Sequence, residues 1–288
     1  MSAILSRLLP FLSILALLSC NDNGTDQKAS QVDSLALSKD SARTDDSLVY
    51  EDCYEKFFDG GLHPVDSNKV MLTLKNGDRV TLAQFFRDKN SPAFARCISK
   101  SIDNDTIPEL IMSSYTGGAH CCDEINIFAK DKNDYTFKAK LYGGFVCIDP
   151  ATNVFTYSFN ETLGYFFGCY ACGFSDSTKD FTTLREIALR YVKGKFEVQR
   201  YSAETEKKLL HNLQLLHEHG YEDVEDGLMD SGWRKEFAMN FAVWHYNNGK
   251  SWAATKKLFD QYYTFKDAAK IWKEFSSTLK DAEKQSTI

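Results

Sequence analysis

The sequence lacks an excess of positive charge. Lys and Arg number 34 against 40 Asp and Glu, which gives the 288-residue chain a formal net charge of -6, and no basic cluster stands out. A nucleic-acid partner requires a basic surface that neutralises phosphates, so this balance argues against one. The 43% of hydrophobic residues suffice for one sizeable core or two small ones, and most of the chain is therefore expected to fold.

Familiar catalytic motifs are absent as well. The chain contains no HExxH zinc motif, no GxSxG nucleophile elbow, no P-loop and no dinucleotide-binding glycine fingerprint. No catalytic residue is therefore assigned from the sequence. Because enzymes commonly assemble acid and base groups from distant segments, an enzymatic function stays open but has no positive support.

The sequence has only one long apolar run, at its start. Residues 8–18 follow Arg7 and are too few for a spanning helix, which needs about 20 residues. The run ends in LLSC at residues 17–20, which resembles the lipobox of bacterial lipoprotein signal peptides. The resemblance implies a signal peptide over residues 1–20, cleavage before Cys20, and a lipid such as palmitate on Cys20. An ordinary secretory signal or a chance apolar start is the alternative.

The lipid would anchor the protein in the bacterial cell envelope, as an outer-membrane lipoprotein that faces the periplasm or the cell surface. Residues 21–48 are polar and rich in Ser and Asp, with too little apolar surface to fold. We expect this segment to be a disordered tether that holds the folded part away from the lipid. An acidic sorting signal directly after Cys20 is the alternative.

Seven cysteines remain beyond Cys20. An exported chain meets an oxidising compartment, so these cysteines are expected to form up to three disulfides and to leave one thiol. Cys53 and Cys97 flank the first predicted strands, which favours a bridge between them, and the remaining pairing cannot be deduced from the spacing. The seven candidates are Cys53, Cys97, Cys121, Cys122, Cys147, Cys169 and Cys172.

Residues 49–201 show short β-type runs separated by turns. The runs at 70–74 and 80–82 flank the pair Asn76-Gly77, which predicts a tight hairpin, and 83–87 form a predicted helical turn. Strands at this spacing are typical of an antiparallel sandwich, barrel or partial propeller. The other predicted strands are 95–100, 109–115, 124–129, 135–141, 154–159, 165–170, 183–192 and 196–201.

At Ser202 the hydrophobic period changes from two to 3.6 residues. This change predicts a domain boundary, with an N-terminal β-rich domain at 49–201 and a helical domain of about four helices at 202–288. The fold class predicted for the chain is therefore α+β.

The helical segment carries recognisable boundary signals. Gly220 is expected to end the first helix, Ser251 to cap the third, and Thr264 with Asp267 to form the capping box of the fourth. The tail from Ala282 is expected to fray. The histidines of this segment do not form metal-binding pairs at helical spacing and are expected to be ordinary surface or core residues.

An acidic loop directly precedes the run at 109–115. Asp103 and Asp105 lie two residues apart, and Glu109 follows four residues after Asp105, just past a proline. This spacing lets a tight loop turn oxygen atoms onto a hard cation such as Ca²⁺, which takes about six to eight oxygen ligands. The alternative is that Asp103 and Asn104 only form Asx-type turn bonds.

The loop SIDNDTIPEL, residues 101–110, resembles the DxDGDGxPEL signature of FG-GAP/VCBS-like repeats, the calcium-loop units of integrin-type β-propellers. The segment YTGGAHCC that follows is similar to one in some uncharacterised bacterial exported proteins. In this loop a serine replaces the first Asp, both glycines are absent and no second copy exists, so weak affinity is expected. The resemblance implies Ca²⁺ ligands from the side chains of Ser101, Asp103, Asp105 and Glu109 and from the carbonyl of Ile107.

These features predict a non-enzymatic, lipid-anchored envelope protein that binds an envelope protein or a glycan, or that scaffolds a complex. One alternative is an envelope hydrolase with a site between the β-domain and the helices, where Asp103, Asp105 and His120 would support metal-assisted chemistry. Another is a thiol oxidoreductase that uses Cys169 and Cys172, whose C-x-x-C spacing also permits a soft-metal site. Structural disulfides are the simpler interpretation of these cysteines in an exported chain.

Overall fold

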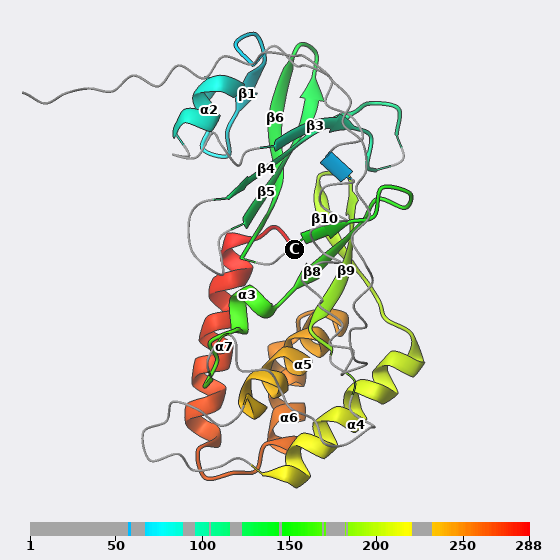
Figure 1. Cartoon of the computed structure of the whole chain (residues 1–288), viewed down its shortest axis with the longest axis vertical. Coiled ribbons are helices and arrows are strands. Elements are labelled where there is room, and N and C mark those ends of the chain that lie inside the picture. Colours follow the sequence, from blue (N-terminus) through cyan, green and yellow to red (C-terminus); the bar gives the residue numbers. More distant parts are fainter. Residues whose placement is uncertain are drawn as a thin grey trace, which may run out of the picture. The chain divides into compact units, whose positions relative to one another are not determined.

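The described residues of this computed structural model all lie within Asp45–Ile288, and Figure 1 shows how their helices and strands are arranged. The α+β class expected from the sequence is confirmed, because sheets of six and four strands precede four long helices. Among the described residues, no helix combines the length and the hydropathy needed to cross a bilayer. The predicted lipobox and tether lie outside the described residues, which are 57–58, 67–88, 96–103, 105–115, 123–143, 146–168, 170, 182, 184–220 and 232–288.

The larger sheet has six strands in the order β2-β1-β6-β5-β4-β3. Neighbouring strands are antiparallel with one exception, since β1 runs parallel to β6 and pairs Leu72 with Tyr135. This parallel pairing covers only the first part of β6, because β1 ends at Thr73 opposite Thr136. The strands are β1 Met71–Thr73, β2 Arg79–Thr81, β3 Arg96–Lys100, β4 Glu109–Tyr115, β5 Asp123–Asp131 and β6 Asp134–Tyr142.

The predicted hairpin of β1 and β2 is confirmed, and its turn explains why Asn and Gly stand there. Gly77 has a φ of 90°, a left-handed conformation that favours glycine, and its N–H donates to the Leu74 carbonyl at 2.9 Å. The Asp78 N–H donates to Asn76 Oδ1 at 3.0 Å. Helix α2, Leu82–Asp88, follows β2 directly and packs on the larger sheet.

Both faces of strand β4 are buried. Leu110 and Met112 contribute to a small core shared with α2, whereas Ile111 between them belongs to the main core. All three side chains are at most 1% exposed. A strand buried on both sides has a continuous apolar run in place of an alternating one, which explains the Leu-Ile-Met sequence after the acidic loop.

The smaller sheet is an antiparallel meander in the order β10-β9-β8-β7. Strand β7 and the short helix α3, Asn160–Leu163, were not predicted from the sequence. The strand predicted over 165–170 is wrong, because its described residues form turns and bends after α3 and Phe166 packs on Phe275 of the last helix. The strands are β7 Val146–Ile148, β8 Val154–Ser158, β9 Glu186–Val192 and β10 Lys195–Gln199.

Four long helices follow β10, and the first begins where the hydrophobic period changes. Ser202 caps this helix with a hydroxyl that accepts the Thr205 N–H at 3.1 Å, and Gly220 ends it with a φ of 73°. Ser251 caps the third as predicted, accepting the Ala254 N–H at 3.3 Å. The helices are α4 Ala203–His219, α5 Trp233–Asn247, α6 Trp252–Tyr262 and α7 Ala268–Gln285.

The start of α7 differs from the prediction. The side chain of Asp267 makes no capping hydrogen bond, so the capping box expected with Thr264 is not formed. Oδ2 of Asp267 instead accepts from Arg234 Nη2 at 2.8 Å and from the Tyr263 hydroxyl at 3.2 Å. A hydrogen bond between two charged groups is stronger than one to a neutral backbone N–H, which explains this choice of partner.

The C-terminal residues do not fray as expected from Ala282 onward, since α7 continues past this point and the chain then returns to the sheets. The Thr287 N–H donates to the Lys140 carbonyl at 2.7 Å, on the part of β6 that β1 does not cover. The Phe196 N–H of β10 donates to the Thr287 carbonyl at 3.4 Å. The end of the chain therefore joins both sheets to α7.

The main hydrophobic core combines side chains from both sheets and all four long helices. Helix α5 packs against β9 and β10 and buries Phe237 and Phe241 to 1% exposure or less. Glu236 in its first turn is completely buried and forms a two-pronged ion pair with Arg185, which directly precedes β9. The sheets and the helices are thus connected by apolar packing and by a buried charge pair.

His245 is fully buried near the end of α5. Its Nδ1 lies 2.7 Å from the Thr255 hydroxyl of α6, and its Nε2 lies 3.2 Å from Glu283 Oε1 of α7. This imidazole joins three helices and is a core histidine, as the sequence predicted.

Candidate functional site

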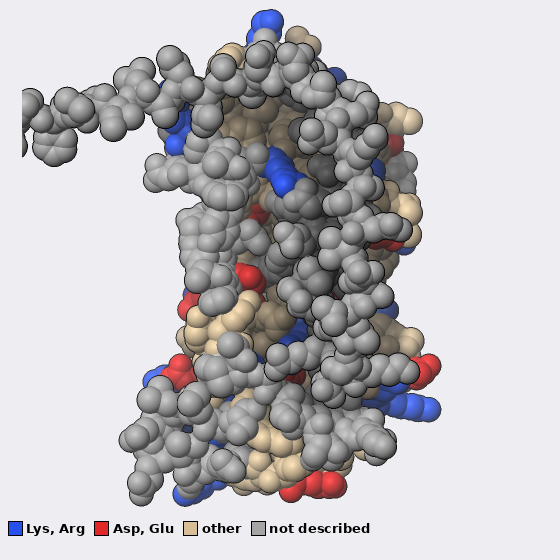
Figure 2. All heavy atoms as spheres, viewed as in Figure 1, with Lys and Arg blue, Asp and Glu red and all other residues tan. Residues whose placement is uncertain are grey.

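Acidic and basic side chains are interspersed over the described part of the face shown in Figure 2, so charge alone marks no site there. Among the described residues, three carboxylates converge, those of Asp103, Asp105 and Glu109, with one oxygen from each within 4.8 Å of the others. Two ligands on opposite sides of a calcium ion lie about 2.4 Å from it each, and thus about 4.8 Å apart. The spacing of the three oxygens therefore suits a single ion.

Hydrogen bonds within the loop explain how it positions these groups. The Ser101 hydroxyl donates to the Asp105 carbonyl and closes the loop. The Asp105 N–H donates to Asp103 Oδ1 at 3.2 Å, and the Ile107 N–H donates to Asp105 Oδ1 at 2.7 Å. The Asx-type turn bond expected of Asp103 is thus present, Asp105 makes a second one that was not predicted, and Asn104 lies outside the described residues.

The loop also places the two remaining predicted ligands. The Ser101 hydroxyl donates its hydrogen bond to the loop backbone, so only the lone pairs of its oxygen remain available to bind a cation. Ile107 is at the outer side of the loop, with a side chain that is 51% exposed. The structure therefore brings together the three carboxylates. Ser101 contributes mainly a hydrogen bond that closes the loop.

Glu109 is the buried member of the group. It is the first residue of β4, is 4% exposed, and accepts the Ile102 N–H on Oε2 at 3.1 Å. Burial raises the pKa of this carboxyl to about 7, and the negative charges of Asp103 and Asp105 add to the rise, against the lowering effect of the Ile102 N–H. A cation between the three carboxylates would offset the repulsion from Asp103 and Asp105 that adds to this rise, and would favour the ionised form of Glu109.

The acidic loop lies at the junction of the two sheets. Lys100 Nζ, at the end of β3, donates to the Pro150 carbonyl at 2.8 Å in the turn between β7 and β8. Asn153 from the same turn donates through Nδ2 to the Ser101 carbonyl at 3.3 Å. On β9, burial raises the pKa of Tyr191, and the charges of the three loop carboxylates raise it further, which places its phenol near them. These contacts place the three loop carboxylates beside the smaller sheet, and the predicted hydrolase site between the β-domain and the helices stays a hypothesis.

Asn153 and Tyr191 were missed by sequence reasoning. They lie about 50 and 90 positions after the loop, and nothing in their neighbourhood marks them as parts of the same site. Asn153 does carry one weak local signal, because its φ of 55° is a conformation that asparagine tolerates better than most residues. Its Oδ1 is buried and has no hydrogen-bond partner among the residues that the structure describes. Such an amide oxygen is a ligand type that Ca²⁺ accepts, so the residues present fit the ion.

Two of the seven cysteines beyond Cys20 are described. Cys97 on β3 is a free cysteine, so the predicted bridge between Cys53 and Cys97 is wrong. Burial raises the pKa of the Cys97 thiol to about 12, which makes it a structural and unreactive group. Cys147 on β7 is disulfide-bonded to a cysteine outside the described residues.

The remaining predicted site residues fall outside the described residues. They include His120 and the pair Cys169 and Cys172, on which the soft-metal and thiol-oxidoreductase alternatives depend. Those alternatives stay hypotheses, as do lipidation of Cys20 and the other disulfides, whose candidates are Cys53, Cys121, Cys122, Cys169 and Cys172.

Comparison with known proteins identifies no relative of this chain. No family model, no curated protein and no solved structure matches the chain.

Proposed function

We propose that this chain is a lipid-anchored protein of the bacterial envelope, which binds a partner or scaffolds a complex through a folded body that a weak calcium site stabilises. The lipobox at residues 17–20 and the polar segment 21–48 support the anchor and the tether. The observation that carries the proposal is the convergence of three carboxylates at the junction of the two sheets. A site in this position would join the sheets and would not need to catalyse a reaction.

Calcium is the ion that the donor set favours. The candidate ligands offer oxygen only, which suits hard cations, and the irregular loop suits the flexible geometry of Ca²⁺ better than the strict octahedron of Mg²⁺. Asp103, Asp105 and Glu109 would supply charge, and the orphaned Oδ1 of Asn153 would supply a neutral oxygen from the other sheet. Bound Ca²⁺ would then connect β4 to the turn between β7 and β8.

The proposal is tested by thermal unfolding of the full chain in neutral detergent, with millimolar Ca²⁺ or with a chelator. An ion that binds only the folded state stabilises it by about 2.7 kcal/mol at one hundred times its Kd. Each kcal/mol moves the Tm of a body of this size by about 2–4 °C. We therefore expect Ca²⁺ to raise the Tm by several degrees, and Mg²⁺ to raise it less.

Asp103→Asn is the informative variant, because the amide oxygen can still accept the Asp105 N–H while the charge is lost. It should abolish most of the calcium shift. Asp131→Asn, at the exposed end of β5, removes the same charge outside the site and should retain the shift. An unchanged Tm at millimolar Ca²⁺ would show that the loop is only a turn and binds no calcium. An equal loss of the calcium shift in both variants would show that the shift arises from nonspecific charge screening.

A further inference from the structure

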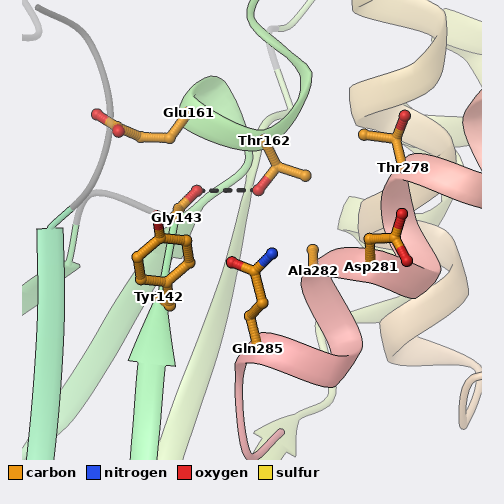
Figure 3. A pocket seen from close by; sticks show the side chains of 8 residues that line it. All are labelled: Tyr142, Gly143, Glu161, Thr162, Thr278, Asp281, Ala282 and Gln285. Carbon is orange, nitrogen blue, oxygen red and sulfur yellow. Dashed lines mark hydrogen bonds between the residues drawn. The ribbon is translucent and has the colours of Figure 1, made fainter. Parts of the chain in front are cut away.

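A groove runs along α7 and consists of two adjoining hollows. One, of about 330 Å³, lies between α7 and the region where β6 and α3 meet, and another, of about 370 Å³, continues along the turns after α3. Thr162 and Thr278 line both hollows, which makes the groove continuous. Figure 3 shows the first hollow, with Thr162 of α3 on one side and Asp281 and Gln285 of α7 on the other.

One face of α7 forms a wall of this groove. Glu274, Thr278, Asp281 and Gln285 recur at helical spacing and so lie on the same side of the helix. A neighbouring side of α7 is held in the main core, which makes the wall rigid. The side chains that hold it there are Ile271, Phe275 and Leu279.

Aromatic rings line both parts of the groove, and two of them already attract a lysine of the chain. Lys140 Nζ lies 5.0 Å from the centre of the Tyr142 ring, and Lys270 Nζ lies 5.2 Å from that of Phe167. Tyr165 differs, since its side chain is 64% exposed and the described residues place no cation over its ring. An exposed tyrosine in a groove offers a platform for a cation of a ligand.

The charged side chains that line the groove are all acidic, while Lys140 and Lys270 stand over two of its rings and Lys284 lies beside Asp281. Glu161, Glu274 and Asp281 line it, and its described lining residues include no Lys, Arg or His. Asp281 is paired with Lys284 at 2.8 Å, but the two side chains are 59% and 75% exposed. A pair this exposed contributes little to stability, so a ligand cation can replace the lysine.

We infer that this groove binds an extended basic peptide segment, whose Lys or Arg side chains contact Tyr165, Glu274 and Asp281. Charge complementarity selects a cationic occupant, and the length of two joined hollows selects an extended one. The inference rests on the proposed binding function and names the chemistry of its partner. It does not depend on calcium, because the acidic loop lines neither hollow.

The inference is tested by fluorescence anisotropy of a fluorescein-labelled decapeptide of alternating Lys and Ser, titrated with the full chain in neutral detergent. The double variant Glu274→Gln with Asp281→Asn should weaken binding about tenfold or more, since two charge contacts are lost. Tyr165→Ala should weaken it severalfold through the lost cation contact. All three side chains are exposed, so circular dichroism should show an unchanged fold.

A matched control removes the same charge elsewhere. Glu204 on α4 and Asp260 on α6 are exposed carboxylates that each pair with a lysine one turn away, as Asp281 does, and neither lines the groove. Glu204→Gln with Asp260→Asn should leave the affinity within about twofold.

Three results would overturn the inference: no binding of the lysine peptide, equal weakening by the control variant, or tighter binding of an alternating Glu and Ser peptide or of the neutral sugar chitohexaose. The calcium shift in Tm is measured on the same preparation. A shift without peptide binding would reject the groove and leave the proposed calcium-stabilised body standing. Peptide binding without a shift would reject the calcium site alone.

Discussion

Glu109 and Cys97 show how burial changes single titratable groups in the larger sheet. Burial raises the pKa of both groups, but the consequences differ. The pKa of the Cys97 thiol rises to about 12, so the thiol stays protonated at neutral pH, whereas the pKa of the Glu109 carboxyl rises to about 7. Cys97 is therefore inert. Glu109 instead makes the stability of the loop depend on pH or on a cation.

We predict that, with chelator present, ionisation of Glu109 lowers the free energy of unfolding as the pH rises from about 4.5 to about 7. The folded-state pKa lies above the unfolded value of 4.5, so in this window the folded state binds more protons and each rise in pH favours unfolding. Glu109→Gln mimics the neutral form and should remove this decline. Chemical denaturation at several pH values measures it.

Glu197→Gln on β10 is the control, since Glu197 is exposed and, among the described residues, forms an ion pair with Lys195 at the surface. Its decline with pH should match that of the unmodified chain. If Glu109→Gln showed the same decline, ionisation of the buried Glu109 carboxyl would not be the cause.

The convergence of Asp103, Asp105 and Glu109 could be predicted because a seven-residue stretch encodes it. The spacing of acidic residues and the proline before Glu109 act through local turns, and local turns depend on local sequence. Asn153 and Tyr191 come from the other sheet. Their position depends on how two sheets pack, and no pattern within one segment of sequence contains that information.

Among the elements, those with a local cause were predictable. The hairpin at Asn76-Gly77 and the caps at Ser202 and Ser251 follow from backbone geometry within four residues. The strand predicted at 165–170 was wrong because tertiary packing determines the conformation of this aromatic run. Phe166 packs on a helix that begins about one hundred residues later. The missing capping box at Thr264 has a similar cause, since a distant arginine binds Asp267.

We predict that Glu236→Ala lowers the free energy of unfolding by about 3–5 kcal/mol, because it leaves the guanidinium of Arg185 without its buried partner between α5 and β9. Arg185 keeps 24% exposure, which favours the lower end of this range. The control is Asp260→Ala in the exposed pair with Lys256 on α6, for which a change below about 0.5 kcal/mol is expected. Urea denaturation compares them, and similar values for both would contradict a special role for the buried pair.

At the scale of the whole unit, the C-terminal residues cover the part of the β6 edge that β1 does not pair with. An exposed strand edge invites pairing with another chain, and β1 covers only the first part of β6. Thr287 and Ser286 occupy the rest, with Ser286 accepting the Tyr142 N–H at 3.0 Å. No sequence pattern indicated this, because the contact joins the C-terminal residues to a strand that lies 147 positions earlier in the sequence.

We predict that Thr287→Pro lowers the free energy of unfolding by about 1–3 kcal/mol and promotes self-association, because proline cannot donate to the Lys140 carbonyl. Thr287→Ala retains the N–H and loses only the hydroxyl that accepts the Lys140 N–H, so it should cost less and leave the chain monodisperse. Denaturation and light scattering measure the two effects. Equal behaviour of the variants would show that the backbone contact is not what protects the edge.

Thr287 lies 147 positions after Lys140, so their contact closes a long loop of the chain. Contacts of high sequence separation carry the largest loop-closure entropy and form after local hairpins have paired. This stretch of β6 is therefore expected to be among the last parts of the larger sheet to find its partner during folding.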